Sequence, residues 1–362
     1  MSDPLSAAGL RARVQECIDA ELATQGDVLA ELGPDVDDLL AAIRTLLSGG
    51  KRLRAAFLYW GLRAAGRPDS DGAIRLATSM EFFQAAALLH DDVMDDSDTR
   101  RGAPAAHRSL ATDHQRRAWT GDADRFGAAG AILAGNLCLT WTDELYATAG
   151  LPDADLARGR ALFDRMRSQL MAGQFLDVVE SVRPWDALDS AERLTRARRV
   201  IHYKSAKYSI EHPLLIGALV GGLANEPLAA LSRYGLALGE AFQLRDDLLG
   251  VFGDPATTGK PAGDDLREGK RTVLVAHTLD GADERGRDLL ARRLGSPDLT
   301  PQDVADLRQV ITDSGAVSAI EAEITALTAT AHEALAAAEG DLEPEAAKVL
   351  ADLVDVTTAR AT

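Results

Sequence analysis

The sequence contains little cysteine and few aromatic residues, and both shortages limit what kind of protein it can form. Two cysteines, Cys17 and Cys138, occur in 362 residues, which is too few, at too wide a spacing, for a disulfide framework or a zinc site. Aromatic residues make up 5% of the chain, whereas alanine is abundant. This composition favours close-packed helices over a β-sandwich. The low cysteine content fits a reducing compartment, and we expect a cytoplasmic location.

Positive charge and long apolar runs are also scarce. With 39 Lys and Arg against 56 Asp and Glu, the formal net charge is −17, which excludes the basic footprint of a nucleic-acid-binding protein. The same charge repels phosphorylated ligands, so such a ligand would need local cations or a metal ion. The first residues lack the apolar core of a signal peptide. The most apolar run, residues 213–224, is too short to span a bilayer, so we expect no transmembrane segment.

Apolar residues recur at helical spacing along most of the chain, and no strand pattern is present. Leu39, Leu40, Ile43 and Leu46 mark one such helix. The tail, residues 301–362, is also expected to be helical. Repeats and linkers are absent, so we predict one all-α domain over residues 1–362.

Two further local features belong to this fold prediction. Thr300-Pro301-Gln302-Asp303 has the pattern of a capped helix start. The long polar stretch 103–130 is expected to form an extended loop or a lid.

Carboxylates are concentrated in residues 88–102, LLHDDVMDDSDTRRG. If the preceding apolar run continues as a helix, Asp91 and Asp95 lie four residues apart on one face, and Asp92 lies in the same turn. Like charges at this spacing destabilise a helix by roughly 0.2–0.5 kcal/mol per pair. The cluster therefore indicates a site for a hard cation, Mg²⁺ with Mn²⁺ as the alternative.

Simpler interpretations of these acidic residues remain open. Asp96 and Asp98 are expected to be solvated surface groups, and His90 is expected to be a packed neighbour of the cluster. The spacing does not match an EF-hand, which needs a glycine at the sixth position and a glutamate at the twelfth. Further along, Gly253 and Gly259 superficially resemble a P-loop, but the spacing is wrong and no strand precedes them.

Two segments have residues suited to bind phosphate groups. In residues 48–54, SGGKRLR, a glycine pair and three cations precede a helix expected over residues 55–65, which suits a diphosphate cradle. A plain helix connection with surface cations is the alternative. In residues 202–208, Lys204 and Ser205 lie side by side, although such pairs are common on solvated helices.

A second acidic cluster, Asp246-Asp247, follows Phe242-Gln243-Leu244-Arg245. Gln174 and Asp177 lie three residues apart on the helix expected over residues 155–182, and we expect them to support a site without contacting its ligand.

In combination, these motifs resemble the trans-isoprenyl diphosphate synthases, also called polyprenyl synthetases. The resemblance covers about residues 49–271. The motifs that carry it, in chain order, are GGKRLR at 49–54, DDVMD at 91–95 followed by RRG, GQFLD at 173–177, YKSA at 203–206, FQLRDD at 242–247, and GDPATTGK followed by DLREGK. The resemblance implies an all-α, single-domain helical bundle with its active site in a central cavity.

The resemblance also implies the chemistry. Isopentenyl diphosphate would be condensed with an allylic diphosphate (dimethylallyl, geranyl or farnesyl) to a linear all-trans polyprenyl diphosphate, with Mg²⁺ as cofactor. A homodimer is the expected assembly.

Site roles carry over residue by residue from this resemblance. The metal ligands would be Asp91, Asp92, Asp95 and Asp246. The isopentenyl diphosphate site would include Lys51, Arg54, Gln84 and Arg101. The groups around the allylic diphosphate would be Arg100, Lys204, Ser205, Gln243, Lys260 and Lys270, of which Arg100, Lys204 and Lys260 would act in catalysis. A supporting layer would consist of Gln174, Asp177, Asp247 and Asp265.

Two positions depart from the commoner pattern. The second motif commonly reads Asp-Asp-x-x-Asp, but Gly250 stands at its last position, so Asp246 is the expected ligand there. Asn136 stands where many relatives carry Asp.

The resemblance also implies a product length, which is set by side chains on the helix that precedes Asp91. In short-chain relatives, aromatic residues four and five positions before the first Asp block the growing chain. Here those positions hold Ala87 and Ala86, and the next bulky residues are Phe83 and Phe82, one turn or about 5.4 Å deeper. We therefore expect a twenty-carbon product, geranylgeranyl diphosphate.

Four alternatives stay open at this point. Another helix could form the floor, which would give a longer product, and a farnesyl product would be shorter than expected. The chain could also be a class I terpene cyclase or a catalytically silent partner subunit.

Overall fold

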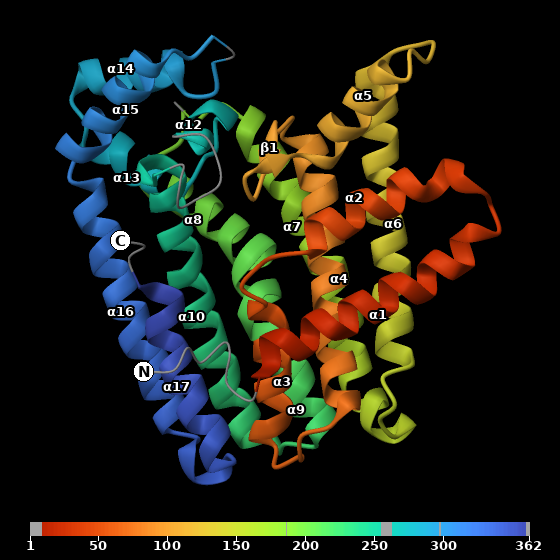
Figure 1. Cartoon of the computed structure of the whole chain (residues 1–362). Helices are drawn as coiled ribbons and strands as arrows, with labels where there is room; N and C mark the ends of the chain where they lie inside the picture. The colour runs from red at the N-terminus through yellow and green to blue at the C-terminus, as the bar shows by residue number, and fades with distance from the viewer. Residues whose placement is uncertain (1–8, 186, 255–262, 297, 360–362) are drawn as a thin grey trace. The chain divides into compact units, whose positions relative to one another are not determined.

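A computed structural model describes residues 9–185, 187–254, 263–296 and 298–359, and most of them lie in helices (Figure 1). The predicted all-α fold is therefore confirmed. The contacts divide the chain into two compact units, Met1–Arg160 with Ile216–Leu223, and Ala161–Leu215 with Ala224–Thr362. Among the described helices, none combines the length and the apolar character needed to cross a membrane.

The first unit is built around one long helix. Its elements are α1 (Leu10–Ala30), the 3₁₀ turn η2 (Pro34–Val36), α2 (Asp37–Leu47), α3 (Leu53–Ala64), α4 (Asp71–Met94), the strands β1 (Thr99–Arg100) and β2 (Ala103–Pro104), α5 (Ala106–Arg116) and α6 (Ala123–Ala147). Helix α4 packs against α1, α2, α3, α5 and α6. Because it has neighbours on several sides, its sequence is apolar on most faces.

Helix α4 begins and ends at recognisable residues. The Ser70 side chain caps the N-terminus by accepting a hydrogen bond from Ala73 N. At the other end the helix runs to Met94, and Asp95 is the C-cap. The predicted continuation of the helix through Asp91 and Asp92 is thus confirmed.

The prediction of a loop or lid over residues 103–130 is wrong. Helix α5 and the start of α6 occupy most of this stretch. His107, Leu110, Ala111 and His114 are buried at helical spacing, against α6. Since two of these four buried residues are histidines, the segment looked polar throughout although its pattern is amphipathic.

The second unit is organised around α10. Its elements are α8 (Ser190–Val200), the π-helix η3 (Ile201–Glu211), α10 (Asn225–Phe252), α12 (Asp264–Glu268), α13 (Val273–Gly281), α14 (Glu284–Arg293), α15 (Pro301–Asp313), α16 (Ala316–Ala336), the 3₁₀ turn η4 (Glu339–Asp341) and α17 (Pro344–Thr358). Helix α10 packs against η3, α12, α13, α16 and α17. The boundary between the units falls within α7 (Asp153–Val182) and α9 (His212–Gly221).

Helices α15 and α16 form as the sequence predicts. Thr300 and Asp303 make a reciprocal capping box at the start of α15. On α16, Ile320 and Ile324 belong to the apolar core of the second unit. This core surrounds α10 and fixes the position of the acidic residues that α10 carries.

Candidate active site

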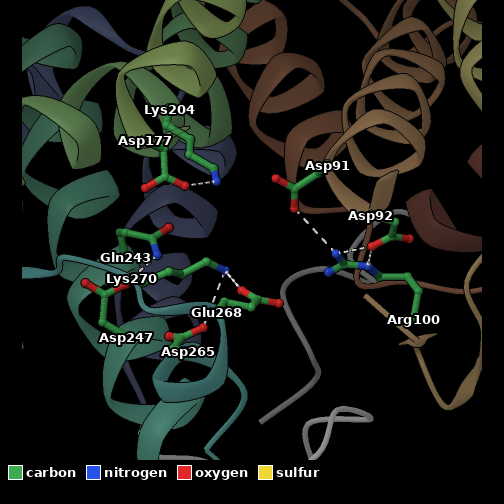
Figure 2. A network of polar contacts seen from close by, with 10 residues as sticks. All are labelled: Asp91, Asp92, Arg100, Asp177, Lys204, Gln243, Asp247, Asp265, Glu268 and Lys270. Atoms are coloured by element: carbon green, nitrogen blue, oxygen red, sulfur yellow. Dashed lines mark hydrogen bonds and ion pairs between the residues drawn. The ribbon is translucent and has the colours of Figure 1, made fainter. Parts of the chain in front are cut away.

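The first acidic motif lies at the C-terminal end of α4, where Arg100 binds two of its carboxylates (Figure 2). Arg100 Nε donates to Asp92 Oδ1 at 2.7 Å, and Nη2 reaches Asp92 Oδ1 and also Asp91 Oδ2, the latter at 3.4 Å. The Asp92 side chain is only 3% exposed. A guanidinium therefore compensates the most buried carboxylate of the motif.

The chemistry of this motif suits a divalent cation. Asp91, Asp92 and Asp95 offer only oxygen donors, as Mg²⁺ prefers. They also lie at a helix C-terminus, where the helix dipole is negative and disfavours further negative charge. Within the described ranges, no group of three Asp, Glu, His or Cys side chains is arranged to hold a metal ion. The motif fits a cation by its donor set, and Arg100 supplies positive charge to it in this structure.

The paired arginines after the motif separate at a hairpin turn. Strands β1 and β2 pair Arg100 with Ala103, so Arg101 and Gly102 form a two-residue turn. Both have positive φ, 55° and 77°, as a type I′ hairpin turn requires. The turn lets Arg100 face the α4 carboxylates while Arg101 points elsewhere.

Arg101 binds the glycine segment that precedes α3. Its Nη1 donates to the carbonyl oxygens of Leu46 and Gly49, at 2.6 and 2.5 Å. At Gly50 φ is 123°, a backbone conformation that favours glycine, and a Cβ there would lie 3.0 Å from Arg101 Nη2. The structure thus brings the RRG and GGKRLR motifs together.

Sequence reasoning missed the ion pair between Arg52 and Glu81, which also holds the glycine segment before α3. Arg52 has φ 56° and caps α3, and its Nη1 lies 3.0 Å from Glu81 Oε2, with both side chains at most 5% exposed. Glu81 Oε1 also accepts a hydrogen bond from Ala55 N. A single carboxylate within the apolar stretch 76–86 was the signal for this pair, because a buried charge needs a partner.

Positively charged side chains gather around the glycine segment that precedes α3. Burial lowers the pKa of the Arg101 guanidinium, and its neighbours Arg52, Arg100 and Arg54 lower it further, although the Glu81 charge opposes them. Crowded, partly desolvated guanidinium groups attract a polyvalent anion. Of the other predicted residues here, Lys51 is exposed and Gln84 is half-buried on α4.

The predicted chain-length residues have different environments along α4. Phe82, Phe83 and Ala86 are completely buried, whereas Ala87 is half-buried. The Phe82 ring packs edge-on against Trp141 of α6, with centroids 6.1 Å apart.

The half-buried positions Gln84, Ala87, Leu88 and Asp91 form one strip on the α4 surface. Phe83 lies four residues before Ala87, at the buried end of this strip, because side chains at i and i+4 share a helix face.

The simpler interpretations of the neighbouring residues are confirmed. His90 packs against Gly135 of α6, with Nε2 3.2 Å from Ile132 O. The Asp96 and Asp98 side chains are 80% and 79% exposed, and both pair with Arg108.

In the second unit, the π-helix η3 carries Lys204 and Ser205. Lys204 Nζ lies 2.5 Å from Asp177 Oδ2 of α7 (Figure 2), so the structure brings the YKSA and GQFLD motifs together. Ser205 is buried and Gln174 is half-buried. π-helical turns are rare and are frequent at functional sites.

Two glycines allow neighbouring helices to approach the wide π-helix. A Cβ at Gly173 of α7 would lie 2.6 Å from Lys204 N, and one at Gly239 of α10 would lie 2.7 Å from the Ala206 backbone. Sequence reasoning quoted Gly173 in the GQFLD motif without assigning it a role. The glycine is the reason that Lys204 can lie this close to α7.

The second acidic motif, on α10, contains one exposed and one buried carboxylate. Asp246 is exposed, and Asp247 is 5% exposed. Gln243 Nε2 donates to Asp247 Oδ1 at 2.7 Å (Figure 2), so Gln243 supports Asp247 in this structure. Burial raises the pKa of the Asp247 carboxyl well above its usual value, and the nearby charges of Asp265 and Asp246 raise it further, although the Gln243 hydrogen bond opposes them.

Lys270, two residues after the end of α12, lies beside these carboxylates. Lys270 Nζ binds Glu268 and lies 3.4 Å from Asp265 Oδ1 (Figure 2). The predicted Lys260 lies outside the described residues.

A further residue that sequence reasoning missed is Arg245, whose guanidinium binds both oxygens of Glu321 on α16, at 2.7 and 2.8 Å. This pair orients α10.

Comparisons with known proteins point to one family. A family model described as polyprenyl synthetase matches residues 36–313. The chain is 32% identical to a geranylfarnesyl diphosphate synthase of Aeropyrum pernix over 285 residues, which cover 78% of this chain and 81% of that protein. It is 31% identical over 317 residues to a short chain isoprenyl diphosphate synthase of Methanothermobacter thermautotrophicus, covering 87% and 89% of the two chains.

Solved structures share the fold. The crystal structure of a geranylgeranyl pyrophosphate synthase from Corynebacterium glutamicum, complexed with isoprenyl diphosphate and magnesium, matches with a TM-score of 0.90 and 38% identity. The match covers 97% of this chain and 98% of that chain.

Proposed function

The chain belongs to the polyprenyl synthetase family, and from this premise we propose that it condenses isopentenyl diphosphate with an allylic diphosphate to form an all-trans polyprenyl diphosphate. The enzyme is a prenyltransferase. We further propose Mg²⁺ as the cofactor and geranylgeranyl diphosphate as the main product. The Corynebacterium glutamicum synthase, whose structure holds isoprenyl diphosphate and magnesium, supports the substrate class and the cation.

The observation that carries the proposal is the combination of cations and carboxylates in the first unit. At the hairpin between β1 and β2, Arg101 binds the glycine segment before α3 and Arg100 binds the α4 carboxylates. Two adjacent arginines therefore link the proposed anion-binding segment to the proposed cation-binding carboxylates. A reaction between two diphosphates needs both kinds of group, because their charges must be neutralised before they can approach.

In the proposed reaction, the allylic C–O bond breaks and diphosphate leaves with the electron pair. The double bond of isopentenyl diphosphate attacks the allylic cation, a C–C bond forms, and a proton is lost to give the longer chain. A bound divalent cation supplies positive charge that stabilises the leaving diphosphate. The residues proposed to bind divalent cations are Asp91, Asp92 and Asp95 in the first unit and Asp246 in the second. The side chains proposed to bind the leaving group are Arg100, Lys204, Ser205, Gln243, Lys260 and Lys270.

The proposed product length rests on Phe83 rather than Phe82. Phe82 packs against Trp141 as part of the interface between α4 and α6. Phe83 lies one turn, about 5.4 Å, before the half-buried Ala87, and one turn is comparable to one isoprene unit. Phe83 therefore forms the floor under a growing chain that passes Ala87.

Variants along α4 test this floor. Phe83→Ala should lengthen the product beyond twenty carbons, and Ala87→Phe should shorten it to fifteen. Ala87 is the better site for added bulk, because Ala86 is completely buried and a larger side chain there overpacks the core. Phe82→Ala is the matched control, expected to lower stability by about 3–5 kcal/mol without changing product length. Unchanged products in both Phe83→Ala and Ala87→Phe would contradict the floor.

The proposed activity is tested by incubating the full chain with Mg²⁺, isopentenyl diphosphate and each allylic primer, then dephosphorylating and sizing the products. A twenty-carbon alcohol supports the proposal. A hydrocarbon formed without isopentenyl diphosphate would instead identify a terpene cyclase. The absence of turnover with every primer would identify a silent partner subunit.

We also infer that the protein forms a homodimer, and exposed apolar residues on α6 support this inference. Ile132 and Leu133 on this helix are 43% and 53% exposed, and adjacent exposed apolar side chains favour association. Sedimentation equilibrium should give twice the chain mass of 38.5 kDa. The mass of a single chain at micromolar concentration would contradict the dimer.

A further inference from the structure

Gly250 has a structural explanation in this chain. A Cβ at residue 250 would lie 2.0 Å from Asp265 Oδ2 and 2.4 Å from Asp265 Cγ. Gly250 lies inside α10 and is not among the glycines with positive φ, so the backbone conformation does not require glycine. A side chain at residue 250 would instead have to displace the Asp265 carboxylate, which already fills the place where that side chain would begin.

This places the Asp265 carboxylate on the acidic face of α10. Gln243, Asp246, Asp247 and Gly250 lie three or four residues apart and share that face. Asp265, from the first turn of α12, contacts the face at Gly250, about one helical turn beyond the two aspartates. Three carboxylates from two helices therefore follow one another along the same surface.

Several carboxyl groups gather around Lys270. Its Nζ lies near both Asp265 and Glu268, and Asp246 and Asp247 lie on the adjacent face of α10. Asp247 Oδ2 is buried and has no hydrogen-bond partner within the described residues. A buried, unpartnered carboxylate oxygen is costly unless a cation or donor meets it.

We propose that Asp265 completes the second acidic motif as a cation-binding residue, with its carboxylate in the position that a side chain at residue 250 would occupy. This inference rests on the proposed function, because the bound group is the divalent cation of the diphosphate reaction. Asp246 and Asp265 would bind the cation, and Asp247 would orient them. Gly250 is then a requirement of the site, because it leaves room for the ligand that α12 supplies.

The first experiment measures cation binding separately from turnover. Mn²⁺ binding to the full chain, in the presence of inorganic diphosphate, is followed by the electron paramagnetic resonance signal of free Mn²⁺. Asp265→Asn keeps the size of the side chain and removes its charge, and it should weaken Mn²⁺ binding at least about tenfold. Asp264→Asn, at the neighbouring residue of α12, is the matched control and should bind Mn²⁺ as the wild type does.

The second experiment tests the shared position. Gly250→Ala should weaken Mn²⁺ binding because its methyl group displaces the Asp265 carboxylate. In the Asp265→Gly background, Gly250→Ala should have little further effect, since the displaced group is gone. The exchange variant Gly250→Asp/Asp265→Gly should recover Mn²⁺ binding relative to Asp265→Gly. Thermal unfolding of each variant in EDTA checks that all of them fold.

The outcomes separate this inference from the proposed function. If the wild type makes prenyl diphosphates and binds Mn²⁺, but Asp265→Asn does so equally well, the inference is overturned and the proposed function stands. Additive losses for Gly250→Ala and Asp265→Gly would also overturn it. If the wild type neither turns over substrate nor binds Mn²⁺, both are overturned.

Discussion

Helices α4 and α10 both carry paired aspartates near their C-terminal ends, but different partners meet the two pairs. At α4, Arg100 binds the buried Asp92 and reaches Asp91. At α10, the buried Asp247 receives a hydrogen bond from the neutral amide of Gln243. A guanidinium stabilises an ionised carboxylate more strongly than an amide does.

The two Asp-Asp pairs have the same sequence but different electrostatic environments. The first pair is compensated by charge from the adjacent hairpin. The second pair combines an exposed carboxylate, Asp246, with a buried carboxyl whose pKa is raised well above its usual value. Removing charge from the two motifs should therefore have opposite effects on stability. Of the three predictions that follow, the first concerns turnover and the other two test this difference in stability.

The largest expected effect is on turnover at the first motif. Asp91→Asn removes a proposed cation ligand at the helix end and should lower kcat/KM by about a thousandfold. Asp96→Asn is the control, because Asp96 is exposed and pairs with Arg108; it should leave turnover nearly unchanged. Steady-state rates with isopentenyl and allylic diphosphates measure both variants. Equal rates for the two variants would remove the distinction between the motif and its surface neighbours.

Next in size is the effect on stability of breaking the charge compensation at α4. Arg100→Gln leaves the buried Asp92 carboxylate without its guanidinium, and should lower the free energy of unfolding by about 3 kcal/mol. Arg108→Gln removes only the exposed pairs with Asp96 and Asp98, which costs about 0–1 kcal/mol. Urea unfolding in EDTA measures both.

Added Mg²⁺ sharpens this second prediction. It should restore part of the stability that Arg100→Gln loses, since a ligand that binds the native state stabilises it. If Arg100→Gln is as stable as Arg108→Gln in EDTA, the guanidinium does not compensate Asp92.

The smallest expected effect has the opposite sign and concerns α10. The native pKa of Asp247 lies well above its usual value of 3.8, so over this window the native state keeps a proton that the unfolded chain has lost. Stability therefore falls as pH rises above about 4 towards the native pKa. Asp247→Asn removes this contribution and should raise the free energy of unfolding at neutral pH by about 1–3 kcal/mol.

Urea unfolding in EDTA, repeated from acidic to neutral pH, measures the effect. The Asp247→Asn variant should lose part of the pH dependence that the wild type shows. Identical slopes for the two proteins would mean that Asp247 titrates normally in the metal-free fold.

Much of the fold was predictable because it depends on local pattern. The helices expected in the tail after residue 300 and the Thr300 capping box both appear in the structure. The segment of α5 was the exception, because its buried residues include two histidines. Hydrophobic pattern identifies a helix only when the buried positions are apolar.

The candidate site was predictable in its residues and less so in its contacts. Asp177 and Lys204 were assigned to different layers of the site, but the structure pairs them directly. Gln243, which is proposed to bind the allylic diphosphate, also donates a hydrogen bond to Asp247 in this structure. Arg52 was passed over in its motif because its role depends on a carboxylate 29 residues away. Such pairings depend on how helices pack, which residue spacing within one helix does not encode.

The sequence by itself determined the helical fold, the acidic and basic motifs and the class of chemistry, because periodicity, charge and motif order are properties of short segments. Only the tertiary structure decided which partner each charged group has and why residue 250 is glycine. Those outcomes depend on distances between segments that are remote in the chain, such as the space on α10 that the Asp265 carboxylate fills. Close packing makes such positions sensitive to a single methyl group.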